Sequence, residues 1–124
     1  MNEYRIESDS IGEKQVPASA YYGVQSMRAE ENFRISGKRV HPELVRAITE
    51  VKKAAAITNR DVGVIEARIA DAMIEACDDI LAGKLLDNFI VDAVQGGAGT
   101  SLNMNSNEVV ANRAIEILGG TKGD

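Results

Sequence analysis

Two apolar stripes separated by a short break constrain the fold of this chain more than any other feature. Apolar and small side chains recur at steps of three and four residues over residues 44–58 and again over 65–80. This spacing places them on one face of an α-helix. Because only residues 61–63 separate the two segments, the helices are expected to pack antiparallel. The first stripe is Leu44, Ile48, Val51, Ala55 and Thr58, and the second is Ile65, Ile69, Ala72, Met73, Ala76 and Ile80.

The ends of the predicted helices follow from capping residues. His41-Pro42-Glu43 begins the first helix, because proline suits a first turn and an acidic side chain complements the helix dipole there. That helix is predicted to reach about Arg60, and the second to stop before Gly83. A third helix is predicted from a stripe that ends before Gly119, and Asn105 with Glu108 resembles a capping pair at its start. Its stripe is Met104, Val109, Val110, Ala114, Ile117 and Leu118.

The rest of the chain lacks helical periodicity. Residues 4–17 alternate loosely around polar, turn-forming side chains, which predicts a short irregular hairpin. Residues 27–39 are predicted as a loop, and residues 84–94 as an extended buried connection. The predicted fold class is therefore mainly α, with a short irregular N-terminal hairpin followed by three helices.

The run from Gln95 to Val109 joins this connection to the third helix and is rich in glycine, hydroxyl and amide side chains. Glycine lets a backbone approach a ligand closely, and a helix start offers unpaired N–H groups to an anion. The run is therefore predicted to be a binding turn for a carboxylate or a phosphate. Thr100 and Ser101 could instead act only as caps, since both residue types are favoured at helix starts. The residues alone leave both interpretations open.

Composition excludes several classes of function. The chain has 14 basic and 19 acidic residues and a net charge of -5, so it offers no cationic surface for nucleic acid. No apolar run approaches the roughly 20 residues of a membrane span, and the N-terminus lacks a signal-peptide core. We therefore expect a cytoplasmic protein. The length of 124 residues fits one domain. The lone cysteine, Cys77, is expected to be a small core residue.

No other residue pattern predicts catalysis, metal binding or nucleotide binding. His41 has no carboxylate or second histidine at a useful spacing, so it is expected at a helix start or on the surface. Asp78 and Asp79 point about 100° apart on a helix and are expected to be solvated. The glycine run has Leu102 where a dinucleotide fingerprint needs its third glycine, and it lacks the lysine of a P-loop.

Residues 96–109 resemble the first signature of the aspartase/fumarase superfamily of lyases. Residues 11–17 and 21–25 are similar to the N-terminal segment of that family, and residues 51–56 to its first long helix. Alanine at position 98 and serine at position 101 are typical of the members that remove ammonia from L-aspartate. Class II fumarases usually carry serine and glutamine at these places and are the alternative.

The resemblance implies reversible conversion of L-aspartate to fumarate and ammonia, with no metal or organic cofactor. Thr100, with Ser101 beside it, is implied to bind a carboxylate of this small dicarboxylate substrate, and Asn103 is implied as a third residue of the binding site, where it holds the turn in shape. Members of the family are homotetramers whose active sites combine segments of three subunits. Neither nucleic acid nor a membrane is an expected partner.

The resemblance also implies that residues 1–124 are an incomplete N-terminal lyase domain. The family's central helix bundle and the mobile loop that carries its catalytic serine base are absent from this sequence, so no catalytic residue is assigned here. The isolated chain is expected to be inactive. Two alternatives from other classes remain open, a non-catalytic helical interaction module and a free-standing anion-binding domain.

Overall fold

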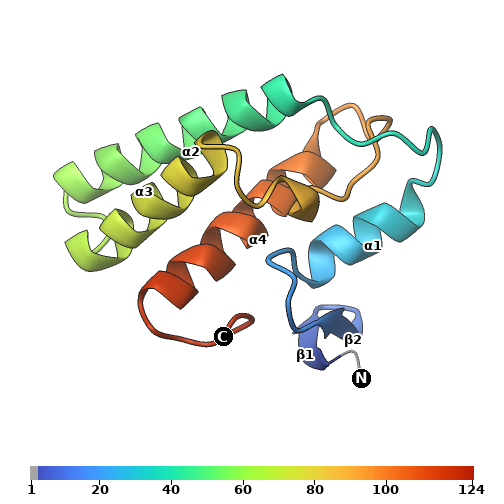
Figure 1. Ribbon diagram of the computed structural model, residues 1–124, viewed down its shortest axis with the longest axis horizontal. Helices are drawn as coiled ribbons and strands as arrows, with labels where there is room; N and C mark the ends of the chain where they lie inside the picture. The colour runs from blue at the N-terminus through green and yellow to red at the C-terminus, as the bar shows by residue number, and fades with distance from the viewer. Residues whose placement is uncertain (1–2) are drawn as a thin grey trace.

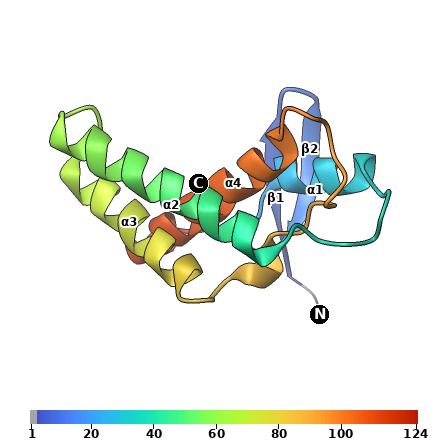
Figure 2. The same cartoon turned by 90° about the horizontal axis from the view of Figure 1, so that it is seen from above.

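Over residues 3–124, which a computed structural model describes, the chain forms a β-hairpin, four α-helices and one short 3-10 helix (Figure 1). The mainly α fold class is therefore confirmed. The hairpin and α1 lie at the end of the molecule away from the α2–α3 turn, and α4 runs between the two parts (Figures 1 and 2). The elements are β1 (Tyr4–Asp9), β2 (Gly12–Pro17), α1 (Val24–Asn32), α2 (Pro42–Asp61), α3 (Ala67–Leu81), η1 (Leu86–Asn88) and α4 (Thr100–Ile117).

The helices α2 and α3 form the antiparallel pair that the two apolar stripes predict (Figures 1 and 2). The helix α2 begins where expected, since His41 is its N-cap and Nδ1 of His41 accepts the N–H of Glu43 at 3.1 Å. This hydrogen bond satisfies one of the N–H groups that a helix start leaves free. His41 therefore has a structural role at a helix start, as predicted.

The predicted buried face of α2 is wrong. The buried residues are Val45, Thr49 and Ala56, whereas Leu44 and Val51 of the predicted stripe are 53% and 65% exposed. Thr49 can be buried because its hydroxyl donates to the carbonyl of Val45 at 2.7 Å. The predicted stripe is therefore offset by one residue from the buried positions, and only Ile48 of that stripe is half-buried against the core.

The hydrophobic core lies between α2, α3, α4 and the segment that follows η1. Cys77 is completely buried there, and burial raises the pKa of its thiol to about 11. Its predicted role as a small core residue is confirmed. The fully or nearly fully buried apolar residues include Ala70, Ala76, Cys77, Phe89, Val91 and Val109.

The N-terminal hairpin is more regular than expected. Its two six-residue strands pair antiparallel without a break, from Tyr4 opposite Pro17 to Asp9 opposite Gly12. Arg5 attaches the hairpin to the segment that leads to α1. Its guanidinium donates to the carbonyls of Pro17 at 2.9 Å, Ala20 at 2.8 Å and Tyr22 at 2.8 Å. Because Oε2 of Glu7, in β1, also accepts the N–H of Val24 at 2.9 Å, the hairpin is fixed against the start of α1.

The helix α1 is not predicted by the sequence, which indicated a loop over 27–39. Its charged side chains hide any apolar period, and the contact that holds it is long-range. The carboxylate of Glu108, in α4, accepts the N–H groups of Gly23 and Gln25 at 2.8 Å each and that of Ser26 at 3.1 Å. The Ser26 hydroxyl also donates to it. A carboxylate at a helix start is favoured by the helix dipole.

This contact corrects the predicted capping pair, because Glu108 lies inside α4 and caps α1 instead. It also explains Gly23. A Cβ at this position would lie 2.6 Å from Oε2 of Glu7 and 2.9 Å from Oε1 of Glu108. Glycine lets the backbone come this close to the two carboxylates, and a Cβ at this position would force a carboxylate to move.

Asn105, the other half of the predicted pair, is a buried residue in the interior of α4. Its Oδ1 accepts the N–H of Ile90 at 2.9 Å, and its Nδ2 donates to the carbonyl of Asn88 at 2.8 Å. The predicted connection over 84–94 is buried at Phe89 and Val91, as expected, but it begins with the 3-10 helix η1. Asn105 thus forms hydrogen bonds with backbone groups that have no partner in a neighbouring strand.

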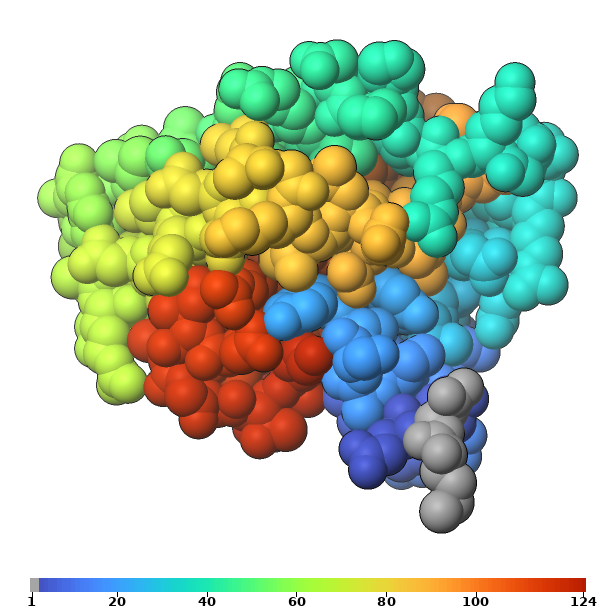
Figure 3. All heavy atoms as spheres, viewed as in Figure 1, coloured from blue at the N-terminus to red at the C-terminus, as the bar shows by residue number. Residues whose placement is uncertain are grey.

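The chain returns to its beginning after α4. Lys122 donates to the carbonyl of Ser19 at 3.0 Å, and the side chain of Asn112 accepts the N–H of Gly123 at 2.8 Å. The C-terminal segment accordingly lies beside the residues that follow β2 on the surface in Figure 3.

We expect Glu108→Gln to destabilise the fold by about 1–3 kcal/mol, the cost of weakening hydrogen bonds to a charged, partly buried group. The measurement is chemical denaturation followed by circular dichroism. Glu50→Gln is the matched control, because Glu50 is exposed and, within residues 3–124, pairs only with Arg46 of its own helix. Equal stability of the Glu108 and Glu50 variants would show that the contact does not hold α1.

Candidate functional site

The glycine turn, residues 95–99, is shaped by its own backbone and by one side chain. The N–H of Gly99 donates to the carbonyl of Gly96 at 3.0 Å, and Gly99 has a φ of 74°, in the left-handed region. The side chain of Gln95 spans the turn, since Oε1 accepts the N–H of Leu102 at 2.9 Å and Nε2 donates to the carbonyl of Asp92 at 3.0 Å. The role of Gln95 was not predicted, because a glutamine beside glycines carries no motif.

Thr100 and Ser101 begin α4 without capping it. The N-cap is Gly99, which has no side chain to form a capping hydrogen bond. Among residues 3–124, no hydrogen bond joins the N–H or hydroxyl of either residue to a protein acceptor, whereas the next N–H is taken by Gln95. The interpretation of these two residues as caps is therefore wrong. Two N–H groups and two hydroxyls remain available to a ligand.

A cleft of about 440 Å³ lies between the glycine turn, α1 and the turn of the hairpin. Its cation, Arg28, is already neutralised, since Nε of Arg28 lies 2.7 Å from Oδ2 of Asp9. The hydrogen bond from Arg28 lowers the pKa of Asp9. The cleft thus offers neutral donors from the turn beside a closed ion pair. It is lined by Asp9, Ser10, Ile11, Gln25, Arg28, Ala29, Asn32, Phe33, Gly96, Gly97, Ala98, Thr100, Ser101 and Met104.

The three predicted binding residues are only partly brought together. Thr100 and Ser101 line the cleft, but Asn103 does not. Asn103 lies one turn further along α4, where its Oδ1 accepts a hydrogen bond from Nζ of Lys52, in α2, at 2.5 Å. Lys52 was not predicted near the site, because 51 residues separate it from Asn103 and no local pattern marks this contact.

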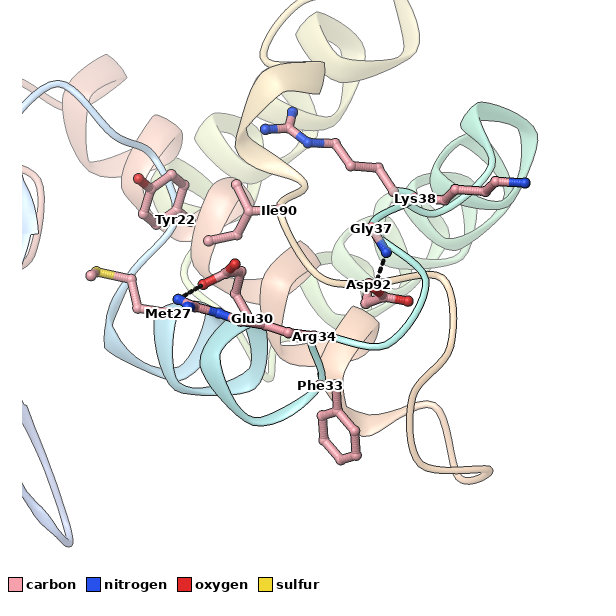
Figure 4. A pocket seen from close by; sticks show the side chains of 10 residues that line it. Tyr22, Met27, Glu30, Phe33, Arg34, Gly37, Lys38, Ile90 and Asp92 are labelled. Carbon is pink, nitrogen blue, oxygen red and sulfur yellow. Dashed lines mark hydrogen bonds and ion pairs between the residues drawn. The ribbon is translucent and has the colours of Figure 1, made fainter.

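In a larger cavity, of about 710 Å³, the polar side chains do not converge on a common point (Figure 4). Glu30 and Arg34 on its wall pair with each other at 3.1 Å, and the side chains of Lys38 and Phe33 point away from its centre (Figure 4). Asp92 is fully engaged. It accepts the Ser36 hydroxyl at 2.7 Å and the N–H groups of Ile35, Ser36, Gly37 and Val94.

Asp92 predicts a pH dependence of stability. The Ser36 hydroxyl, with the backbone N–H groups, holds the pKa of Asp92 far below its usual range. The stability it contributes is therefore complete above about pH 4, its unfolded pKa, and is lost as the pH falls below that value. We expect Asp92→Asn to be less stable than the unsubstituted chain at pH 7, by a margin that shrinks on acidification. Denaturation at several pH values measures this, with the exposed Asp87→Asn as control. A margin that is constant with pH would contradict it.

The remaining candidate residues have structural roles. Asp79 was expected to be solvated, but it is an ion-pair residue that lies 2.8 Å from Nζ of Lys84 and 2.8 Å from a guanidinium nitrogen of Arg113, and these partners lower its pKa. Within residues 3–124, histidine, cysteine and acidic side chains form no group of three that could hold a metal ion. None of the helices described is long and apolar enough to cross a membrane.

Gly99 should tolerate substitution poorly. Space for a Cβ is open there, so the cost of Gly99→Ala comes from the left-handed backbone and is expected to be about 1–2 kcal/mol. Gly97 has equally open space, but its φ is not in the left-handed region. Gly97→Ala is therefore the matched control and should leave the stability nearly unchanged. Thermal unfolding measures both. A neutral Gly99→Ala would mean that the turn adopts another conformation in solution.

Comparison with known proteins assigns the class to which this fold and turn belong. A family model described as "Lyase" matches residues 12–123. The chain therefore belongs to this lyase family. It is 56% identical over 122 residues to an aspartate ammonia-lyase from Bacillus subtilis and 55% identical over 122 residues to a class II fumarate hydratase from Halobacterium salinarum. Each match covers 98% of this chain and 26% of the relative.

The same fold occurs in a solved structure of a fumarate lyase:delta crystallin from Brucella melitensis, with a TM-score of 0.96 and 50% identity. The match covers 98% of this chain and 27% of that one. The chain thus spans about a quarter of the length of the proteins it matches, and it corresponds to their N-terminal part.

Proposed function

We propose that this chain forms one carboxylate-binding wall in the active site of a lyase that converts L-aspartate to fumarate and ammonia. The observation that carries the proposal is the start of α4, where the N–H groups and hydroxyls of Thr100 and Ser101 face a cleft without protein partners. Neutral donors at a helix start suit a carboxylate, because the helix dipole adds a partial positive charge.

The chemistry of such a lyase explains why preorganised donors are needed. A base removes a proton from the carbon beside a carboxylate, the carboxylate oxygens take up the charge as an aci-carboxylate, and ammonia then leaves. Donors fixed in advance around those oxygens stabilise the charge as it develops. Because the one acidic residue of the cleft, Asp9, is paired with Arg28, we assign no base to this chain. In this proposal the base belongs to another segment of the enzyme.

The choice of L-aspartate rests on one residue in the turn and one at the start of α4. The identities to relatives named aspartate ammonia-lyase and fumarate hydratase differ by one percentage point, so similarity alone favours neither. Alanine at position 98 and serine at position 101 favour the ammonia-lyase, and fumarate hydration is the second candidate. The proposal includes a cytoplasmic homotetramer that needs no metal or organic cofactor.

We expect succinate, an unreactive dicarboxylate, to shift the amide resonances of Gly99, Thr100 and Ser101 in a nuclear magnetic resonance titration of the chain. Thr100→Val removes one hydroxyl without changing side-chain size and should weaken binding about 5- to 30-fold, the cost of about 1–2 kcal/mol for one lost hydrogen bond. Thr58→Val, on the exposed face of α2, is the control. Unchanged spectra at millimolar succinate would contradict a binding wall in the isolated chain.

Activity can be tested in a chimera that joins this chain to the remaining three quarters of the Bacillus subtilis relative. We expect the chimera to form fumarate from L-aspartate, and Thr100→Val to lower kcat/KM by about 10²- to 10³-fold, as loss of one oxyanion donor does. The chain without the added segment should be inactive. A fully active Thr100→Val chimera would reject the assigned role, and an inactive but assembled chimera would favour a non-catalytic interaction module.

A further inference from the structure

Lys52 differs from three of the other lysines in the kind of partner that it has. Lys14, Lys53 and Lys84 each pair with a carboxylate. Over residues 3–124, Lys52 forms no ion pair, and its ammonium donates instead to Oδ1 of Asn103 at 2.5 Å. Lys52 is half-buried and extends from α2 to the first turns of α4. The protein therefore keeps a positive charge without an acidic partner beside the turn.

This contact fixes the orientation of the Asn103 amide. An ammonium group can only donate hydrogen bonds, so the amide atom that faces it must be the oxygen. The Nδ2 group of Asn103 is then the end left free, and none of the hydrogen bonds of residues 3–124 uses it. Residues three apart on a helix are neighbours on its surface, so Asn103 lies about 60° around α4 from Thr100, next to the cleft but outside its lining.

We propose that Lys52 is a positioning residue for the carboxylate site. It presents the Asn103 amide as a further neutral donor at the start of α4, and its uncompensated charge raises the positive potential at Thr100 and Ser101. The inference rests on the proposed function, because it names a residue that supports the same dicarboxylate-binding wall. It replaces the predicted role of Asn103 in shaping the turn, since the side chain of Asn103 bonds to α2 and not to the turn.

The test uses the isotope-labelled chain titrated with succinate, followed at the Thr100 and Ser101 amides. We expect Lys52→Met to raise the dissociation constant about three- to tenfold, because a unit charge acts over several ångströms of partly screened protein surface. It should also move the side-chain NH₂ resonances of Asn103 before any ligand is added. Lys52→Arg keeps the charge and the donor and should bind within about twofold of the unsubstituted chain.

Lys53→Met is the control, because Lys53 is the next residue and pairs with Asp78 at 2.5 Å, away from the turn. If Lys52→Met does not fold, Lys52→Gln gives the second test, because glutamine keeps a hydrogen-bond donor but removes the charge. Weaker succinate binding by this variant supports the charge effect. Succinate binding by a folded neutral variant that equals that of the unsubstituted chain would overturn the proposal. No succinate binding by the unsubstituted chain would instead contradict the carboxylate-binding wall in the isolated chain, on which this inference rests.

Discussion

The polar side chains of α4 satisfy backbone groups that the rest of the fold leaves without partners. Glu108 takes the free N–H groups at the start of α1, Asn105 pairs with the irregular segment after η1, and Asn112 donates to the carbonyl of Tyr21 at 2.8 Å. Buried backbone polar groups cost free energy when unpaired, so these contacts hold together segments that no sheet organises. The helix acts as the frame onto which the other elements are attached.

The candidate site depends on a contrast between two helix starts. At α1 the free N–H groups are occupied by two of the protein's own carboxylates, those of Glu108 and Glu7. At α4, Gln95 occupies one N–H and leaves those of Thr100 and Ser101 open. The same chemistry that closes the first start therefore makes the second one suitable for an external carboxylate. Arg28 offers no unpaired positive charge to that ligand, because the Asp9 carboxylate already neutralises its guanidinium.

Much of this organisation could be predicted from the sequence, and the rest depends on long-range contacts. The helical spacing of apolar residues predicted α2, α3 and α4, and the glycine run predicted the position of the turn that precedes Thr100 and Ser101. The helix α1 could not be predicted, because the residue that caps it follows 85 positions after Gly23. The contact of Lys52 with Asn103 likewise joins residues that are distant in sequence. The burial of Thr49 depends on a hydrogen bond that its hydroxyl forms within its own helix.

The close approach at Gly23 links two distant positions in the chain. A Cβ at residue 23 would lie too close to the Glu108 carboxylate, and a shorter residue at 108 would leave the N–H groups of Gly23, Gln25 and Ser26 without this acceptor. Neither position can change alone without loss. Evolutionary replacements at 23 and 108 should therefore occur together, as a correlated pair that marks the packing of α1 against α4.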